Sequence, residues 1–133
     1  MRTSARAIIF IDGKLLTMFR RKRKDNIVKE YYVIPGGGQN EGEALENTVK
    51  RELSEEMELN IEVGDFLGKR KTAETEEYYF FCKVKSGVPK LSGEELERMT
   101  EDNFYEPRLV DIQDLDKIDI SGKDFINKAL QLN

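Results

Sequence analysis

The sequence "GGGQNEGEALENTVKRELSEEMEL", residues 36–59, carries the strongest secondary-structure signal in the chain. Its apolar residues recur at helical spacing, and we expect one helix over 41–57. Asn40 and Glu43 stand three residues apart just before this run, which is the capping-box pattern of a helix start, with Asn40 as the N-cap. The three glycines before the helix predict a turn whose backbone can approach a ligand closely.

The predicted helix carries three glutamates close together, Glu52, Glu55 and Glu56. At about 100° per residue, Glu56 falls inside the apolar stripe and Glu52 borders it; the stripe consists of Leu45, Val49, Leu53 and Met57. A charge run that faced only water would lie opposite this stripe. Ionised carboxylates at the edge of a core are costly unless a cation offsets them. The pattern therefore favours a divalent cation such as Mg²⁺, which prefers oxygen ligands, over the alternative of a solvated charge run.

The spacing of these residues resembles the Nudix box, G-x5-E-x7-R-E-U-x-E-E-x-G-U, in which U is an aliphatic residue. Here the pattern starts at Gly37 and Glu43 and continues through "RELSEEMEL" at 51–59. Every specified position agrees except Glu58, which stands where the family has a glycine. The resemblance implies a Nudix-like α/β/α sandwich with a mixed β-sheet, built from one domain over 1–133.

The resemblance also implies a Mg²⁺-dependent pyrophosphohydrolase, with Mn²⁺ as an alternative metal. Its substrate would be a nucleoside diphosphate linked to another group X, and the diphosphate linkage would be cleaved. The catalytic residues would be Arg51 and the three glutamates, with Glu52 as a candidate for orienting or deprotonating the attacking water. Gly37 and Glu43 would be supporting residues that hold the glutamates in place, as the outer partners of metal ligands commonly do.

Two further ligands of the metal follow from the resemblance. The metal would be held by the three glutamates, by the carbonyl oxygen of Gly36, and by Glu95 from the later acidic stretch "LSGEELERMTEDNFYEP". A solvated surface glutamate is the alternative for Glu95.

The basic run "RRKRK" at 20–24 offers a place for phosphate groups. The guanidinium forks of Arg20, Arg21 and Arg23 match phosphate oxygens, and we expect them to bind substrate. A solvated loop end is the alternative. The net charge of −4 disfavours an extended nucleic-acid surface.

The composition restricts the chemistry and the location. The chain has no histidine, so hydrolysis would rest on carboxylates, lysines, tyrosines or a hard metal. Its single cysteine, Cys82, lies in an apolar strand pattern, and we expect a buried thiol and a reducing cytoplasm. The apolar stretch "AIIFI" is too short to span a membrane. The oligomeric state stays open, with a homodimer among the alternatives.

Most other segments predict strands. "ARAIIFI" and "KLLTMFRRK" flank Asp12 and Gly13, a hairpin signal, so we expect two antiparallel strands here. A basic, polar connection over 20–30 should lead into a strand at "YYVIP". After the helix, "IEVGDFLGKRK" and "EEYYFFCKVK" predict a strand pair joined by an acidic turn, and a polar loop over 86–103 leads to the strand "PRLVDI".

The final segment, "DFINKALQL", predicts a terminal helix whose packed face holds Phe125, Ala129 and Leu132. With it the element order suggests a mixed sheet covered by helices. A second function class also stays open, namely a Nudix-like domain that binds a nucleotide as a sensor without turning it over. Glu58 is the one box position that favours this sensor, whereas the complete set of glutamates favours the enzyme.

Overall fold

The computed structural model describes residues 1–133, and its strands form two four-stranded sheets. The first sheet has the order β5-β1-β7-β6; its strands are β1 (Arg2–Ile8), β5 (Gly36–Gly38), β6 (Asn60–Lys71) and β7 (Thr75–Ser86). Because β1 runs parallel to β7 while the other pairs are antiparallel, this sheet is mixed, as predicted. The second sheet is antiparallel and centres on β3; its strands are β2 (Phe10–Ile11), β3 (Lys14–Lys24), β4 (Ile27–Val33) and β8 (Asn103–Asp111).

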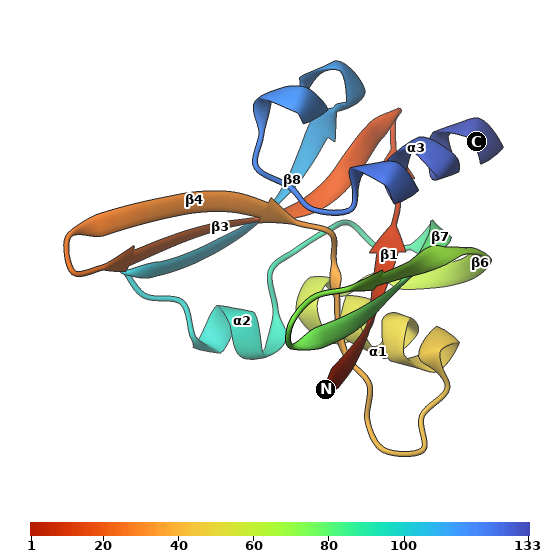
Figure 1. Ribbon diagram of the computed structural model, residues 1–133, viewed down its shortest axis with the longest axis horizontal. Helices are drawn as coiled ribbons and strands as arrows, with labels where there is room; N and C mark the ends of the chain where they lie inside the picture. The colour runs from red at the N-terminus through yellow and green to blue at the C-terminus, as the bar shows by residue number, and fades with distance from the viewer.

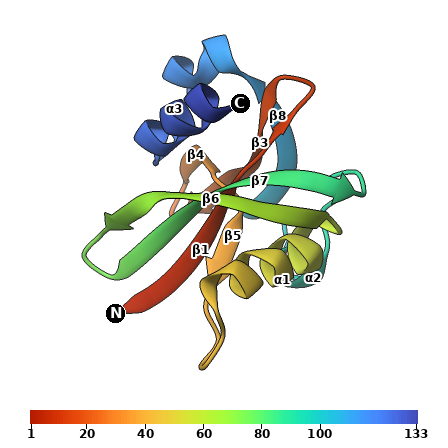
Figure 2. The ribbon, with the colours of Figure 1, turned by 90° about the vertical axis from the view of Figure 1, so that its right-hand side faces the viewer.

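Helices cover the mixed sheet on both sides (Figures 1 and 2). The helical segments are α1 (Leu45–Met57), α2 (Gly93–Glu97), the 3₁₀ segment η1 (Ile112–Lys117) and α3 (Lys123–Leu132). Figure 2 shows α1 and α2 on one side of the sheet and α3 on the other. The expected α/β/α sandwich is therefore confirmed. None of these helices has both the length and the apolar composition that crossing a membrane requires.

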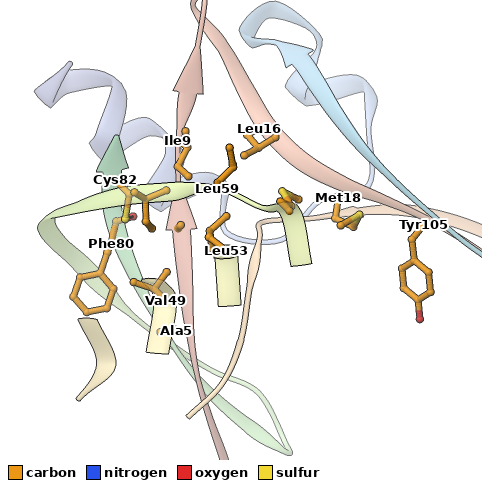
Figure 3. Packing of buried hydrophobic residues seen from close by; sticks show 13 residues of the cluster. Ala5, Ile9, Leu16, Met18, Val49, Leu53, Leu59, Phe80, Cys82 and Tyr105 are labelled. Carbon is orange, nitrogen blue, oxygen red and sulfur yellow. Dashed lines mark hydrogen bonds between the residues drawn. The ribbon is translucent and has the colours of Figure 1, made fainter. Parts of the chain in front are cut away.

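Two apolar clusters fill the spaces between the sheet and its helices. Successive residues of β1 point to opposite faces, so Ala5 and Ala7 pack in the cluster under α1, while Ile8 packs in the cluster under α3. The small alanines leave room for Val49 and Leu53 of α1 to lie close to the sheet (Figure 3). This packing fixes the face of α1 that carries the glutamates.

Cys82 lies in the cluster under α1, as expected for a buried strand residue. Burial raises the pKa of its thiol to about 12, so the thiolate form is suppressed at neutral pH.

The start of α1 differs from the sequence prediction. The helix begins at Leu45 with Ala44 as its N-cap, not after Asn40. Only one of the two capping-box bonds forms: the Asn40 amide donates to Glu43 Oε1 at 3.1 Å, whereas the Glu43 amide donates to the backbone carbonyl of Asn40 and not to its side chain. These two bonds close a separate turn before the helix, because Gly42 takes a positive φ of 74° that a helix cannot continue through.

The first strand prediction was right about the hairpin and wrong about its extent. Asp12 and Gly13 turn the chain between β2 and β3, with φ of 52° and 76°. The predicted strand over 5–11 is split, however, because β1 joins the mixed sheet and only the two residues of β2 pair with β3. The segment 5–11 passes from one sheet to the other, and its continuous apolar sequence does not reveal this break.

The predicted connection over 20–30 is instead a second hairpin. Here β3 and β4 pair from Met18–Val33 to Lys24–Ile27, and Asp25 and Asn26 make the turn with positive φ angles. This hairpin extends away from the body of the protein (Figure 1). Strand pairing with β8 compensates for the low apolar content of the segment.

Two details at the C-terminal side also differ. The polar loop over 86–103 contains the short helix α2. In α3, which was predicted correctly, the buried residues are Ile126 and Ala129, while Leu132 is 53% exposed. Phe125 stacks on Tyr79 from the margin of the packed face. The packed face is thus rotated relative to the prediction.

The end of α1 tests the one departure from the box pattern. Glu58 is the C-cap and takes the left-handed conformation, with φ 54° and ψ 37°. A residue with a Cβ atom costs about 1–2 kcal/mol in this region, and glycine avoids the cost. We therefore predict that Glu58→Gly raises the melting temperature by several degrees in thermal denaturation. Glu58→Ala is the control, because it also loses the weak ion pair with Lys90 but keeps the Cβ atom. A lower melting temperature for Glu58→Gly would contradict the prediction.

Candidate functional site

A cavity of about 490 Å³ lies between α1, the glycine strand β5, and the inner face of the antiparallel sheet. Its wall contains the three glutamates of α1, Gly36 and Gly37 of β5, and residues from β1, β3, β8 and α2. This cavity brings the predicted metal ligands together with several arginines from distant parts of the sequence.

The three glutamates of α1 converge as the helical angles predicted. Each offers a carboxylate oxygen, and these oxygens lie within 4.8 Å of one another. The Glu52 side chain is only 14% exposed, whereas Glu55 is 52% exposed. Glu56 lies at the edge of the core, beside the buried Met57. Negative charge is therefore concentrated at the boundary between cavity and core.

Arg51 holds this group of carboxylates in place. Its guanidinium donates two hydrogen bonds to Glu43, at 2.8 and 3.0 Å, and one to the Gly38 carbonyl at 2.8 Å. It donates further bonds to Glu52 at 3.0 Å and to Glu55 at 3.3 Å. Glu43 also accepts a bond from the Thr48 hydroxyl at 2.8 Å, so its own position is fixed. These contacts are those expected of residues that support metal ligands.

The glycine strand β5 leaves space for the side chain of Glu52. A Cβ atom on Gly37 would overlap the carboxylate group of Glu52. A Cβ atom on Gly36 would overlap the backbone of Ala5, because β5 and β1 pair closely at this point. The triple glycine is therefore part of a strand, where we had predicted a turn, and its missing side chains open the cavity.

Glu95 reaches the site because the segment before α2 is anchored to the end of α1. The Ser92 hydroxyl donates to the Glu55 carbonyl at 2.6 Å, and the Ser92 amide donates to the Glu56 carbonyl at 2.9 Å. Gly93 touches the same turn so closely that a Cβ atom would lie 2.6 Å from the Glu55 carbonyl oxygen. Glu95 lines the cavity and is mostly buried, so it does not fit the alternative of a solvated surface glutamate.

The electrostatics show that the acidic group lacks positive charge. Burial raises the pKa of Glu56 to about 7, and the negative charges of Glu95 and Glu52 add to the rise. Burial likewise raises the pKa of Glu52 and of Glu95, although nearby arginines oppose it. Arg51 instead lowers the pKa of Glu43 to about 2 by hydrogen bonding. The ionised form is therefore disfavoured at Glu52, Glu56 and Glu95, the carboxylates that line the cavity.

The residues fit a divalent metal ion. One carboxylate oxygen of Glu56 and one of Glu95 are buried without any hydrogen-bond partner. Buried acceptors normally find partners, and each one left unpaired costs about 1–3 kcal/mol. A hard cation would satisfy both oxygens and offset the repulsion among the glutamates. The donor set consists only of oxygen atoms, which is the set that Mg²⁺ and Mn²⁺ prefer.

Of the three arginines predicted to bind substrate, only Arg20 lines the cavity. Its guanidinium lies 4.7 Å from the ring centre of Tyr105 and donates to the Tyr105 hydroxyl at 3.0 Å. Its Nε atom is buried and has no partner. Arg21 packs on Phe104, and Arg23 lies near Asp102, both outside the cavity. Because alternate residues of β3 point to opposite faces, one basic run cannot place all three together.

Other arginines of the cavity were missed in the sequence. Arg2 and Arg6 come from β1, and Arg98 follows α2. Nothing marks them locally, since each stands alone between residues of other types. The alternation of β1 does place Arg2 and Arg6 on one face, but the neighbour of that strand is known only from the fold.

Comparisons with known proteins bear on the family and on the fold. A family model described as NUDIX domain matches residues 1–128. The chain belongs to the Nudix family. Membership assigns it to the Nudix-type hydrolases, which act on phosphorus anhydrides. A search of curated proteins finds no match for this chain.

Several solved structures have the same fold. A MutT Nudix hydrolase from Burkholderia pseudomallei is 22% identical with a TM-score of 0.69, and the match covers 98% of this chain and 95% of that one. An ADP-ribose pyrophosphatase from Streptococcus suis is 15% identical with a TM-score of 0.68, covering 98% and 90%. A UDP-X diphosphatase is 18% identical with a TM-score of 0.64, covering 98% and 60%. At these identities the likeness concerns the fold.

The pair of Glu43 and Arg51 gives a test of the site without any metal. The folded protein lowers the pKa of Glu43 from 4.5 to about 2, so the charged form stabilises the fold above pH 4.5. This stabilisation is lost as the pH falls towards 2. We predict that Glu43→Gln lowers the melting temperature at pH 7 in the presence of a chelator, and that the difference from the unmodified protein narrows below pH 4.5.

Glu41→Gln is the matched control, because Glu41 is exposed two residues earlier. Glu41→Gln should leave the melting temperature nearly unchanged at pH 7 and at pH 3. An equal loss at pH 7 and pH 3 for Glu43→Gln would contradict the role given to the ion pair.

Proposed function

We propose that this Nudix domain is a Mg²⁺-dependent pyrophosphohydrolase, with Mn²⁺ as an alternative metal. Its substrate is a nucleoside diphosphate linked to a further group X, and it cleaves the diphosphate linkage. The observation that carries the proposal is the pair of buried, unpartnered carboxylate oxygens beside the three converging glutamates. The buried thiol of Cys82 is consistent with work in the reducing cytoplasm.

The metal would be held by oxygen atoms from three segments of the chain. Glu52, Glu55 and Glu56 supply the α1 carboxylates, the glycine strand supplies the Gly36 carbonyl, and α2 supplies Glu95. When bound, a divalent cation neutralises phosphoryl charge and lowers the pKa of a bound water. The ligand set therefore suits hydrolysis of a phosphorus anhydride without any histidine.

The protein's own residues position the reactants. Arg51 keeps Glu52 and Glu55 in fixed rotamers, so the carboxylates need not reorganise when substrate arrives. Glu52 is the candidate for orienting or deprotonating the attacking water. Arg20 binds a substrate phosphate, because its side chain lines the cavity and guanidinium groups match phosphate oxygens.

A non-catalytic nucleotide sensor is the rival function, and Glu58 is the box position that favours it. Glu58 takes the left-handed conformation that a glycine would take there, and α1 ends as usual. Since the helix end is kept, the carboxylates stay in place. The rival therefore receives no support from the one residue that suggested it.

Removal of a single metal-binding charge tests the proposal. We predict that Glu56→Gln abolishes metal-dependent turnover while the protein stays folded, because the amide keeps the shape of the side chain but not its charge. The measurement is release of phosphate or pyrophosphate from nucleoside triphosphates, nucleotide sugars, ADP-ribose and dinucleoside polyphosphates, with Mg²⁺, Mn²⁺ or a chelator. Circular dichroism reports whether the variant is folded.

Glu46→Gln is the control, because Glu46 is an exposed residue of the same helix that does not line the cavity. It should keep full activity. Near-normal activity of Glu56→Gln would contradict the proposal, and so would nucleotide binding without turnover by the unmodified protein, which would favour the sensor.

The role of Glu95 has a separate test. We predict that Glu95→Ala weakens Mn²⁺ binding at least about tenfold in a metal titration, because it removes a ligand. Glu97→Ala is the matched control, since Glu97 is an exposed residue of the same short helix that does not line the cavity. Unchanged affinity in Glu95→Ala would remove this residue from the metal site.

A further inference from the structure

The hairpin of β3 and β4 carries an exposed basic surface beyond the cavity that holds the glutamates. Alternate residues of a strand point to one face, and residues paired across two strands share that face. Arg20 lines the cavity, and further out the same face carries Lys22 opposite Lys29, and Lys24 opposite Ile27. Ile27 is 71% exposed. These last four residues, all exposed, form what we call the hairpin surface.

The hairpin surface has no negative charge to balance it. None of its three lysines makes an ion pair within the chain. Lys22 and Lys29 lie directly opposite each other, an arrangement of like charges that destabilises a sheet. On the other face of the hairpin, by contrast, Arg23 lies 3.9 Å from Asp102. The hairpin surface therefore suits an acidic partner that also covers an apolar side chain.

The segment around α2 carries a surface with the opposite properties. Residues 94–102 include five acidic side chains and one basic side chain. Leu96 and Met99 are 47% and 37% exposed, which is unusual for large apolar residues beside so many charges. Glu97 and Glu101 are exposed and make no ion pair within the chain. We call these four residues the α2 surface.

The two surfaces lie at the same end of the molecule. Arg20 of the hairpin and Glu94 of α2 both line the cavity, and the hairpin extends past α2 (Figure 1). No ion pair joins the two surfaces within one chain. A two-fold contact between identical chains requires that each chain carry both halves of a complementary pair. Rotation about such an axis brings each hairpin surface against the α2 surface of the other copy.

Other partners fit this end of the molecule less well. A nucleic-acid strand that followed the hairpin lysines towards the cavity would meet the carboxylates of the α2 surface, which repel it. An anionic membrane would first meet Asp25 in the turn of the hairpin. A second copy of the chain offers carboxylates to the lysines and lysines to the carboxylates.

We propose that two copies of this chain associate about a two-fold axis, with the hairpin surface of each docked on the α2 surface of the other. The lysines face Glu97 and Glu101, and Ile27 covers Leu96 and Met99. The contact borders the short helix that carries Glu95. This inference goes beyond the proposed function and does not depend on it.

Sedimentation velocity of the full chain over a concentration series at low salt tests the proposal, and we expect a dimer. Lys22→Glu with Lys29→Glu makes both surfaces acidic, whereas Glu97→Lys with Glu101→Lys makes both basic. Each double variant alone should raise the Kd of the dimer at least about a hundredfold, because like charges then oppose each other across the contact.

An equimolar mixture of the two double variants should restore the dimer, because each hairpin then meets an α2 surface of opposite charge. Misfolding cannot imitate this restoration, since both chains must be intact to associate. Lys83→Glu with Lys85→Glu is the matched control, because these exposed lysines of β7 belong to neither surface. The control changes the net charge as much as Lys22→Glu with Lys29→Glu and should leave the dimer unchanged.

Several results would overturn the inference. These are an unmodified chain that stays monomeric at the highest concentration, a double variant that dimerises as the unmodified chain does, and a mixture that stays monomeric. A monomer that binds a single-stranded oligonucleotide or phosphatidylserine vesicles, and loses this binding in Lys22→Glu with Lys29→Glu, would assign the hairpin to a different partner. All of these results leave the metal-dependent hydrolysis standing, because its test measures turnover and not association.

Discussion

The site depends on one guanidinium that stands among several carboxylates. Arg51 makes five hydrogen bonds, two of them to Glu43 and one to the backbone of the glycine strand. It uses the full donor capacity of the side chain. Yet Arg51 touches only part of the acidic group, and the pKa of Glu56 rises to about 7 because burial and neighbouring charges disfavour its ionised form. The fold therefore leaves negative charge uncompensated at one side of the group, and this is the side that faces the cavity.

Other parts of the structure leave space for these carboxylates and hold them at the cavity. The glycine strand removes side chains where Glu52 needs space, and the alanines of β1 let α1 pack close to the sheet. Ser92 and Gly93 tie the segment before α2 to the last turn of α1, which brings Glu95 to the same cavity from 39 residues further along the chain than Glu56. Small residues and a few backbone contacts thus bring distant segments of the chain together at one cavity.

The sequence predicted that the three glutamates of α1 converge, because helical spacing is a local property. The positions of Glu52, Glu55 and Glu56 follow from about 100° per residue, and the box pattern added Arg51 and Glu43. The arginines of the cavity were less predictable, since their positions depend on which strands are neighbours. Arg6 joins the site only because β1 pairs with both β5 and β7, and Arg21 is excluded only because β3 is a strand at that point.

The central claim is that these carboxylates are arranged around a divalent cation, and a crystal structure with Mn²⁺ tests it most directly. Anomalous scattering identifies the ion and its ligands independently of any activity. We predict a peak bound by Glu52, Glu55 and Glu56, with Glu95 and the Gly36 carbonyl close to it. A crystal grown at saturating Mn²⁺ with no peak at these residues, and with the buried oxygens of Glu56 and Glu95 still without a partner, would contradict the account.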